Sequence, residues 1–385
     1  VEHPLQQAQQ RLVVEHPLQP FALPAFDVLG DARRRSFDAE LADALRRGQA
    51  AVATAAKVPA APPADASAAM PDEDGDDAAI DAAPGAPFFA APLAPPGLEW
   101  RQVALPRLLE FFRNPCRVLL RRRLELEPAR EAEELQDDEP LLPDADARRR
   151  LAQRLLPLLL EGAGTARLPA LALAGSEWPE GSLGELELQH ELHALQQFAQ
   201  RVRETLAEPV LAPYVFTLEL DLDGEAWQLQ AAFADLRASG LQRWRHGPTR
   251  PSDYLAAWLQ HLALCAAAPP GVALRTRWLS SDGEFSFEPC GDAATRLREL
   301  LALYRRGLQQ PLQFYARAGL ALVERGLDAA RAEWWPSTHR PFAEGADPAY
   351  QLALRGIEDP LDAPFQHTAR AVWLPLLQHL QDARR

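Results

Sequence analysis

The amino-acid sequence predicts an α/β (α+β) fold, with a small mixed sheet flanked by helices. The hydrophobic spacing is helical up to residue 207, alternates between residues 215 and 245, and returns to helical spacing after residue 293. Two Asp-Gly pairs, Asp223–Gly224 and Asp282–Gly283, lie between alternating segments and predict tight hairpin turns. The order helices, strands, helix, hairpin, helices indicates a mixed core.

The helical segments can be placed from apolar spacing and from capping residues. Asn114 is predicted to cap a helix that begins at Pro115. The clearest helix covers residues 183–207, where apolar side chains recur by four and three, and another covers residues 252–267. One helical face before the cap is formed by Leu105, Leu108, Leu109 and Phe112. Helices dominate from residue 293 onward, with breaks near Pro311, Pro336 and Pro360.

The strands follow from period-two alternation. Phe216, Leu218 and Leu220 alternate with polar residues before the first Asp-Gly turn, and Trp227, Leu229, Ala231 and Phe233 alternate after it. Leu241–Arg245 is predicted as a third strand, and residues 272–289 as a second hairpin.

Composition divides the chain into three parts. Residues 1–49 predict an extended entry and a helix, and because the first residue is Val1 we interpret the sequence as a fragment of a longer chain. Residues 50–97 are rich in Ala, Pro and Asp and hold too little apolar surface to offset the entropy of ordering, so we predict a flexible, disordered linker. Residues 98–385 form the predicted globular domain.

Cysteine content and hydropathy indicate the cellular location that we expect for the chain. Cys116, Cys265 and Cys290 form no CxxC pair and are odd in number, so we expect neither a disulfide framework nor a structural zinc site. No apolar run is long enough to span a bilayer, and the N-terminus has no signal-peptide pattern. The expected location is therefore the cytoplasm, with no membrane partner.

The net charge of −14 argues against a protein coated evenly in positive charge for nucleic acid. Acidic side chains gather within residues 72–81, whereas arginine triplets lie at residues 33–35, 121–123 and 148–150. Such triplets are most often solvated helix faces, but the triplet Arg121, Arg122 and Arg123 is also a candidate for contact with DNA phosphates.

The order of the predicted elements resembles the nuclease domain of the RecB and AddB proteins, a branch of the PD-(D/E)XK superfamily. The opening of that domain, an aromatic helix followed by a proline restart, is similar to "LLEFFRNPCRVLLRRRL" here. The resemblance implies a metal site in which Asp235 matches the first carboxylate. Arg243 and Arg245 stand where that family has Asp and Lys, and Tyr254 and Trp258 stand where it has Gln and Tyr.

The matched positions keep one carboxylate at most. A hard divalent cation such as Mg²⁺ needs several oxygen ligands, and a guanidinium at Arg243 would repel it at short range. We therefore expect an inactivated nuclease-like domain with no catalytic residue, no bound metal and no cofactor.

Simpler interpretations stay open at the acidic positions. Asp235 is more often a turn residue than a ligand, and Asp221, Asp223 and Glu225 are more often hairpin-turn chemistry than a metal cluster. Cys265 has no evident base beside it and is interpreted as core. The alternative function, an active Mg²⁺-dependent DNA nuclease, would use Asp221, Asp223 or Asp235.

Several short strings, taken in order, resemble the C-terminal region of the RecC family, the gamma subunits of exodeoxyribonuclease V (RecBCD). They are "HPLQPF" at 16–21, "FFRNPCRVLLRRRLEL" at 111–126, "WPEGSLGE" at 178–185, "GLQRWR" at 240–245 and the tail from "QLALRGIEDPLD" onward. The resemblance implies that residues 1–49 enter from a preceding helicase-like part. It also implies that the residues that read the Chi sequence lie mainly outside this chain.

The resemblance implies a non-catalytic subunit of a helicase–nuclease that acts in double-strand break repair by homologous recombination. Its expected partners are the RecB and RecD subunits and forked or single-stranded DNA. The candidate strand contacts are Arg243, Trp244 and Arg245, because an aromatic face stacks on bases and arginines pair with phosphates. Two alternatives stay open: Trp244 is core with the arginines packed against acidic neighbours, or the domain is a pure protein-docking module without DNA contact.

Overall fold

The computed structural model describes residues 87–128, 142–162, 164–175, 178–179, 181–338 and 342–382, together with Phe26 and Arg33. The chain divides into two compact units, Val1–Ala79 and Ile80–Arg385, and the description below concerns the second. The predictions for residues 1–49 and for residues 50–86 lie outside the described residues, apart from those two side chains. Their boundaries therefore stay predictions.

Residues 87–97, which we placed at the end of the linker, contact the globular part. The backbone N–H of Phe88 donates to the carbonyl of Arg355 at 3.1 Å, and that of Leu93 donates to Gln309 at 2.7 Å. The ring of Phe88 packs against the main core and lies 5.5 Å from the guanidinium of Arg355. Our linker boundary was therefore too late, because Phe88 and Leu93 supply apolar and backbone contacts that a count of Ala and Pro hides.

The globular part begins with the short helix η3 (Leu98–Trp100), strand β1 (Gln102–Ala104) and helix α3 (Leu105–Arg113). Of the predicted apolar face of α3, Leu105, Leu108 and Phe112 are buried, whereas Leu109 is only partly buried and Phe111 is buried in addition. Asn114 then caps α4 (Pro115–Val118) by accepting from the N–H of Arg117 at 2.9 Å, as predicted. The helix continues as the π-helical turn η4 (Leu119–Arg123).

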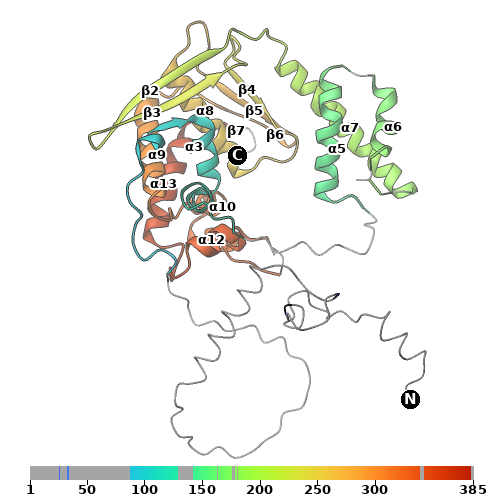
Figure 1. The fold of residues 1–385 in the computed structure, drawn as a ribbon. Helices are drawn as coiled ribbons and strands as arrows, with labels where there is room; N and C mark the ends of the chain where they lie inside the picture. The colour runs from blue at the N-terminus through green and yellow to red at the C-terminus, as the bar shows by residue number, and fades with distance from the viewer. Residues whose placement is uncertain are drawn as a thin grey trace, which may run out of the picture. The chain divides into compact units, whose positions relative to one another are not determined.

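A small helical layer follows, made of α5 (Ala145–Leu160), η5 (Thr165–Arg167), α6 (Leu168–Leu173) and α7 (Ser182–Thr205). These helices lie together in Figure 1. The stripe predicted for the longest helix is buried, and it packs against the leucines of α5. The core of this layer also includes Leu279 of strand β5, so the layer has its own hydrophobic cluster that reaches a sheet.

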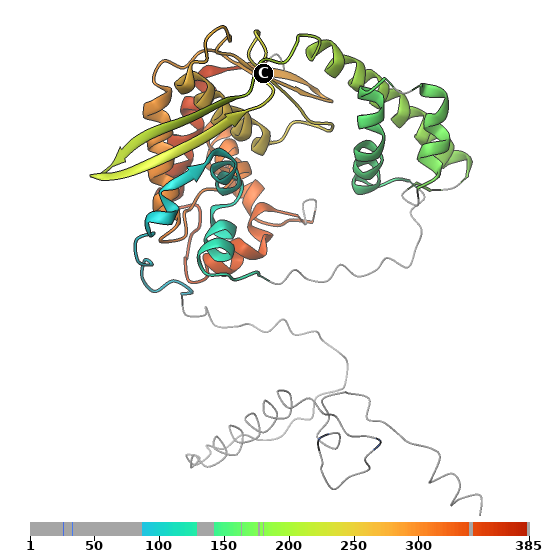
Figure 2. The ribbon, with the colours of Figure 1, turned by 45° about the horizontal axis from the view of Figure 1, so that its top comes forward.

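The first sheet has the order β1-β3-β2. Strand β2 (Tyr214–Leu222) and strand β3 (Glu225–Phe233) form the long antiparallel hairpin seen in Figure 2, and β1 pairs with β3 in parallel. The predicted turn is confirmed, since Asp223 and Gly224 both have positive φ, at 57° and 83°. The side chains of Trp227, Leu229, Ala231 and Phe233 alternate inward from β3.

The second sheet has the order β4-β5-β6-β7. Strand β4 (Leu241–Trp244) pairs in parallel with β5 (Thr276–Ser280), which forms the second predicted hairpin with β6 (Gly283–Phe287). Strand β7 (Leu380–Asp382) pairs antiparallel with β6. The mixed α/β class is confirmed, but the strands form two small mixed sheets, and the predicted third strand belongs to the second sheet.

Helices surround both sheets. They are α8 (Pro251–Ala267), α9 (Ala293–Gly307), α10 (Ala316–Arg325), α11 (Leu327–Trp334), η6 (Glu344–Ala346), α12 (Pro348–Ala353) and α13 (Ala363–His379). In Figure 1, α3, α8, α9 and α13 gather beneath the strands, and their apolar faces share one large core with both sheets. None of the described helices is both long and apolar enough to cross a lipid bilayer.

Candidate functional site

Strand β4 carries the predicted motif, and a glycine sets its position. Gly240 has φ of 107°, and a Cβ atom on it would lie 2.2 Å from the carbonyl oxygen of Arg275. That carbonyl accepts the N–H of Leu241 at 2.9 Å, so the parallel pairing with β5 begins at once. Only glycine allows this close approach with a left-handed backbone. Among the described strands, β4 has no neighbour on its other side, so the motif lies on a sheet edge.

Arg243 is held against the carboxylate that we matched to the first metal ligand. Its Nη1 lies 2.6 Å from Oδ2 of Asp235, and its Nε donates to Oε1 of Gln260 on α8 at 2.5 Å. Asp235 follows β3, and 49% of its side chain is exposed. A cation bound at Asp235 would have to displace this guanidinium.

Arg245 has a carboxylate partner that sequence reasoning did not name. Its Nε and Nη2 both donate to Asp253, with Nη2 at 2.6 Å from Oδ2. Asp253 lies in the first turn of α8, is buried, and also accepts the N–H of Arg250 at 2.8 Å. The interpretation that both arginines pack against acidic neighbours therefore agrees with the structure, and a count of carboxylates within ten residues of Arg245 would have suggested Asp253.

Trp244 is not a core residue. Its side chain is 37% exposed, and one edge of its ring faces Phe198 of α7 at 6.3 Å between ring centroids. Phe198 also lies 5.3 Å from the ring of His246, whose pKa is lowered by burial and by Arg245 beside it. The motif thus presents a half-open aromatic surface next to two arginines that are already paired.

Tyr254 and Trp258 lie on a different face of α8 from these ion pairs. The hydroxyl of Tyr254 donates to Oδ2 of Asp382 at 2.5 Å, and its ring packs on Phe285. Trp258 is buried against Phe287 and His379. The five matched nuclease positions are therefore split: Asp235 and Arg243 meet, Arg245 meets Asp253, and the two aromatic residues belong to the packing between α8, β6 and α13.

The three carboxylates of the first hairpin all have partners within the protein. Asp221 accepts the N–H of Gly224 at 3.1 Å, and Asp223 forms an ion pair with Arg305 of α9. Glu225 pairs with Arg101 at 2.7 Å and with Arg305 at 3.5 Å. Asp221 therefore serves the turn, as that interpretation has it, whereas the side chains of Asp223 and Glu225 form ion pairs with arginines outside the turn.

The arginine triplet lies on the π-helical turn η4. Arg123 donates to the carbonyl of Ala94 at 2.8 Å and lies over the ring of Trp100, so it anchors the segment before η3. Arg121 and Arg122 are exposed and form ion pairs with Glu127 at 3.5 Å and Glu110 at 3.1 Å. Exposed pairs of this kind are weak, so these two side chains can be recruited by another anion at little cost.

The match to known proteins decides the family. A family model described as the RecC C-terminal domain matches residues 100–327, which is more than half of the chain. The chain belongs to the RecC family. Its relatives include the RecBCD enzyme subunit RecC of Escherichia coli strain K12, 29% identical over 229 residues that cover 59% of this chain and 20% of that protein.

Other relatives carry the same name. The RecC subunit of Mycobacterium tuberculosis is 27% identical over 279 residues, or 68% of this chain and 24% of that protein. The RecC subunit of Buchnera aphidicola is 21% identical over 227 residues, or 59% of this chain and 21% of that protein. The chain spans about a fifth to a quarter of the length of the curated relatives it matches.

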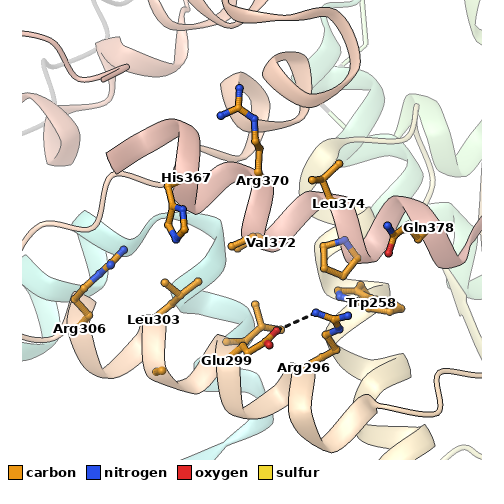
Figure 3. A pocket seen from close by; sticks show the side chains of 14 residues that line it. Trp258, Arg296, Glu299, Leu303, Arg306, His367, Arg370, Val372, Leu374 and Gln378 are labelled. Carbon is orange, nitrogen blue, oxygen red and sulfur yellow. Dashed lines mark hydrogen bonds and ion pairs between the residues drawn. The ribbon is translucent and has the colours of Figure 1, made fainter. Parts of the chain in front are cut away.

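This RecC domain also has a groove that the sequence did not suggest. It lies between α9 and α13, has a volume of about 630 Å³, and has a floor that includes Leu300, Leu303 and Val372. Figure 3 shows Arg306, His367 and Arg370 around it, with Arg296 joined to Glu299. Arg306 donates to the hydroxyl of Thr368, and among the residues that the structure describes neither Arg306 nor Arg370 has an acidic partner.

A second group that the sequence missed combines side chains from distant segments. One ligand atom each from Cys290, Asp292 and His379 lies within 4.8 Å of the others. Nearby, the thiol of Cys265 lies 3.4 Å from Nε2 of His261, so our statement that Cys265 has no base beside it was wrong. The i,i+4 spacing of His261 and Cys265 on one helix was the signal available in the sequence.

Proposed function

We propose that this chain is a non-catalytic part of a RecBCD-like helicase–nuclease, acting in double-strand break repair by homologous recombination. Membership of the RecC family supports this role, and the expected partners are RecB and RecD subunits. The observation that supports the non-catalytic part is the ion pair between Arg243 and Asp235, because Asp235 is the position that the resemblance matches to a metal ligand and its carboxylate is already paired with a guanidinium.

The proposal includes a contact with DNA at the edge of β4. Trp244 offers a half-exposed ring, and stacking of a base on an aromatic side chain is worth about 1–3 kcal/mol. Arg243 and Arg245 are engaged by Asp235 and Asp253, so they contribute positioning of the strand more than free positive charge. Arg121 and Arg122, with weak exposed pairs, are the phosphate contacts that we propose in addition.

The groove between α9 and α13 is a second surface that supports the proposed contact with DNA. Its rim carries Arg306 and Arg370, and its floor is apolar, which suits a single strand with anionic phosphates and flat bases. We therefore extend the proposed DNA path to this groove.

The absence of nuclease activity is tested on the purified chain. Incubation with Mg²⁺ and end-labelled linear DNA should leave the DNA intact, and Asp235→Ala should change nothing. Cleavage that disappears in Asp235→Ala would contradict the proposal and favour the alternative of an active nuclease.

The DNA path is tested in the complex assembled with the RecB and RecD subunits. Trp244→Ala should lower crosslinking of this subunit to forked DNA by about fivefold to tenfold, the size expected when one stacked base is lost. The control variant Arg325→Ala/Arg331→Ala removes exposed charges on α10 and α11 and should have no effect. Unchanged crosslinking for Trp244→Ala and for Arg306→Ala/Arg370→Ala would contradict the proposed path.

A second candidate function, protein docking without DNA contact, is favoured by one surface. Apolar side chains on α6 and α7 are exposed, namely Leu171, Leu173, Leu183 and Leu186. If this surface docks a partner subunit, Leu183→Ser/Leu186→Ser should weaken assembly of the complex without changing the stability of the isolated chain. Assembly is measured by co-purification, and an intact complex would exclude this surface.

A further inference from the structure

The cluster of Cys290, Asp292 and His379 lies at the end of the second sheet opposite β4. Cys290 and Asp292 belong to the segment that links β6 to α9, and His379 is the last residue of α13, directly before β7. Strand β7 pairs with β6. The three side chains therefore come from the two segments that this edge of the sheet brings together.

The distances within the cluster are close to those of a metal site. Sγ of Cys290 lies 3.1 Å from Oδ1 of Asp292, and all three ligand atoms lie within 4.8 Å of one another. Around a tetrahedral Zn²⁺ ion, with bonds of about 2.0–2.3 Å, neighbouring ligand atoms are about 3.3–3.7 Å apart. Shifts of about 1 Å or less in these side chains would complete the arrangement.

His379 is oriented for such a role by its second ring nitrogen. Nδ1 lies 3.0 Å from the carbonyl oxygen of Pro375, one turn earlier in α13. A carbonyl can only accept, so Nδ1 carries a proton, and in the neutral ring Nε2 is then the nitrogen with a lone pair for a metal. Histidines that bind metals nearly always donate their other N–H to a carbonyl or carboxylate in this way.

Asp292 gives an independent observation. It stands at the N-cap of α9, where an aspartate usually accepts a backbone N–H of the helix, but its side chain makes no capping bond. Oδ1 faces the thiol of Cys290 instead, and Oδ2 lies 2.9 Å from Nε of Arg296. The carboxylate of Asp292 therefore does not cap α9, and its Oδ1 faces the thiol of Cys290 instead.

We propose that Cys290, Asp292 and His379 bind one zinc-class divalent ion that ties the segment before β7 to the segment after β6. A thiolate, an imidazole and a carboxylate favour Zn²⁺ over Mg²⁺ or Ca²⁺, which prefer oxygen ligands alone. Binding forms an S–metal bond and releases the thiol proton to solvent. With three protein ligands, a water molecule completes the tetrahedron at the exposed side, where Asp292 is 46% exposed.

The test uses the whole chain after treatment with EDTA. Titration with Co²⁺ should give one ion per chain and a thiolate-to-cobalt charge-transfer absorption, which Zn²⁺ then displaces. Zn²⁺ should also raise the melting temperature, because an ion that binds only the folded state stabilises it. Cys290→Ser should abolish the charge-transfer absorption, and His379→Gln should weaken Co²⁺ binding by at least about tenfold.

Two controls separate this site from other metal binding. Cys116→Ser removes a buried thiol elsewhere, and His193→Gln removes an exposed histidine on α7, so both should bind Co²⁺ as the parent chain does. Asp292→Asn changes an exposed side chain and gives a folded test if Cys290→Ser does not fold. No uptake of Co²⁺ at stoichiometric concentrations, or binding that survives both Cys290→Ser and Asp292→Asn, would overturn the proposal.

Discussion

The two edges of the second sheet hold their polar groups in different ways. At the β4 edge, Arg243 and Arg245 stay charged, and each is bound to a carboxylate that lies beside it. Near the β7 edge, burial lowers the pKa of His261 to about 4, and burial together with Asp292 raises the pKa of Cys290 to about 12, whereas Asp292 itself is exposed and has a lowered pKa. The β4 edge thus holds charged groups in ion pairs, whereas the β7 edge holds a buried thiol and a buried imidazole in their neutral forms.

The largest expected effect comes from breaking the β4 edge at its start. Gly240→Ala places a Cβ 2.2 Å from a backbone oxygen at φ of 107°, so we expect a loss of about 4 kcal/mol in the free energy of unfolding. Gly291→Ala at the other edge is the matched control, because its Cβ would meet nothing within 4 Å. Urea denaturation measures both, and equal losses would contradict the distinct role of Gly240.

The next effect tests the buried ion pair. Arg245→Ala leaves Asp253, whose side chain is 8% exposed, without its guanidinium, and we expect a loss of about 3 kcal/mol. Arg277→Ala breaks an exposed pair with Glu284 and should cost less than about 1 kcal/mol. The double variant Arg245→Met/Asp253→Leu should recover part of the stability, because it removes the unpaired carboxylate but also the capping bond from Arg250. A double variant less stable than Arg245→Ala would show that the unpaired carboxylate is not the cause of the loss.

The smallest of the three effects concerns pH at the β7 edge. The pKa of His261 is lowered from 6.5 to about 4 in the folded chain, so below pH 6.5 the unfolded state binds a proton that the folded state does not. Stability is therefore complete above pH 6.5 and falls as the pH drops, by about 2 kcal/mol at pH 5. His261→Gln should remove this part of the pH dependence in urea denaturation at pH 8 and pH 5, measured with EDTA present. An unchanged pH dependence would mean that another group is responsible.

The elements that depend on neighbouring residues were predictable from the sequence. Capping of α4 by Asn114, the long helix α7 and the Asp223–Gly224 turn follow from side chains within a few positions of one another. The second hairpin also forms, but its loop is Ser281–Asp282, one position before the predicted Asp282–Gly283. The division into two sheets was not, because β1 and β7 have three residues each and show no alternation by themselves. Their partners are chosen by packing across the whole domain.

The candidate sites also differ in whether neighbouring residues in the sequence were enough to predict them. The arginines of β4 could be singled out because the motif is contiguous, although the partner of Arg245 and the separate location of Tyr254 and Trp258 needed the fold. The cluster at the β7 edge joins residues 290, 292 and 379, which carry no common spacing in the sequence. A composition argument based on CxxC pairs cannot find a ligand set that is assembled from three separate positions.

The late strand β7 has a consequence for how the domain folds. It meets β6 across a long stretch of chain, and the bond between Tyr254 and Asp382 spans 128 residues. Contacts so distant in sequence form slowly, since loop closure must precede the favourable contacts. Until then β6 presents an open row of backbone donors and acceptors, which is a template for mispairing with other chains. Docking of three residues thus protects the nascent domain against aggregation.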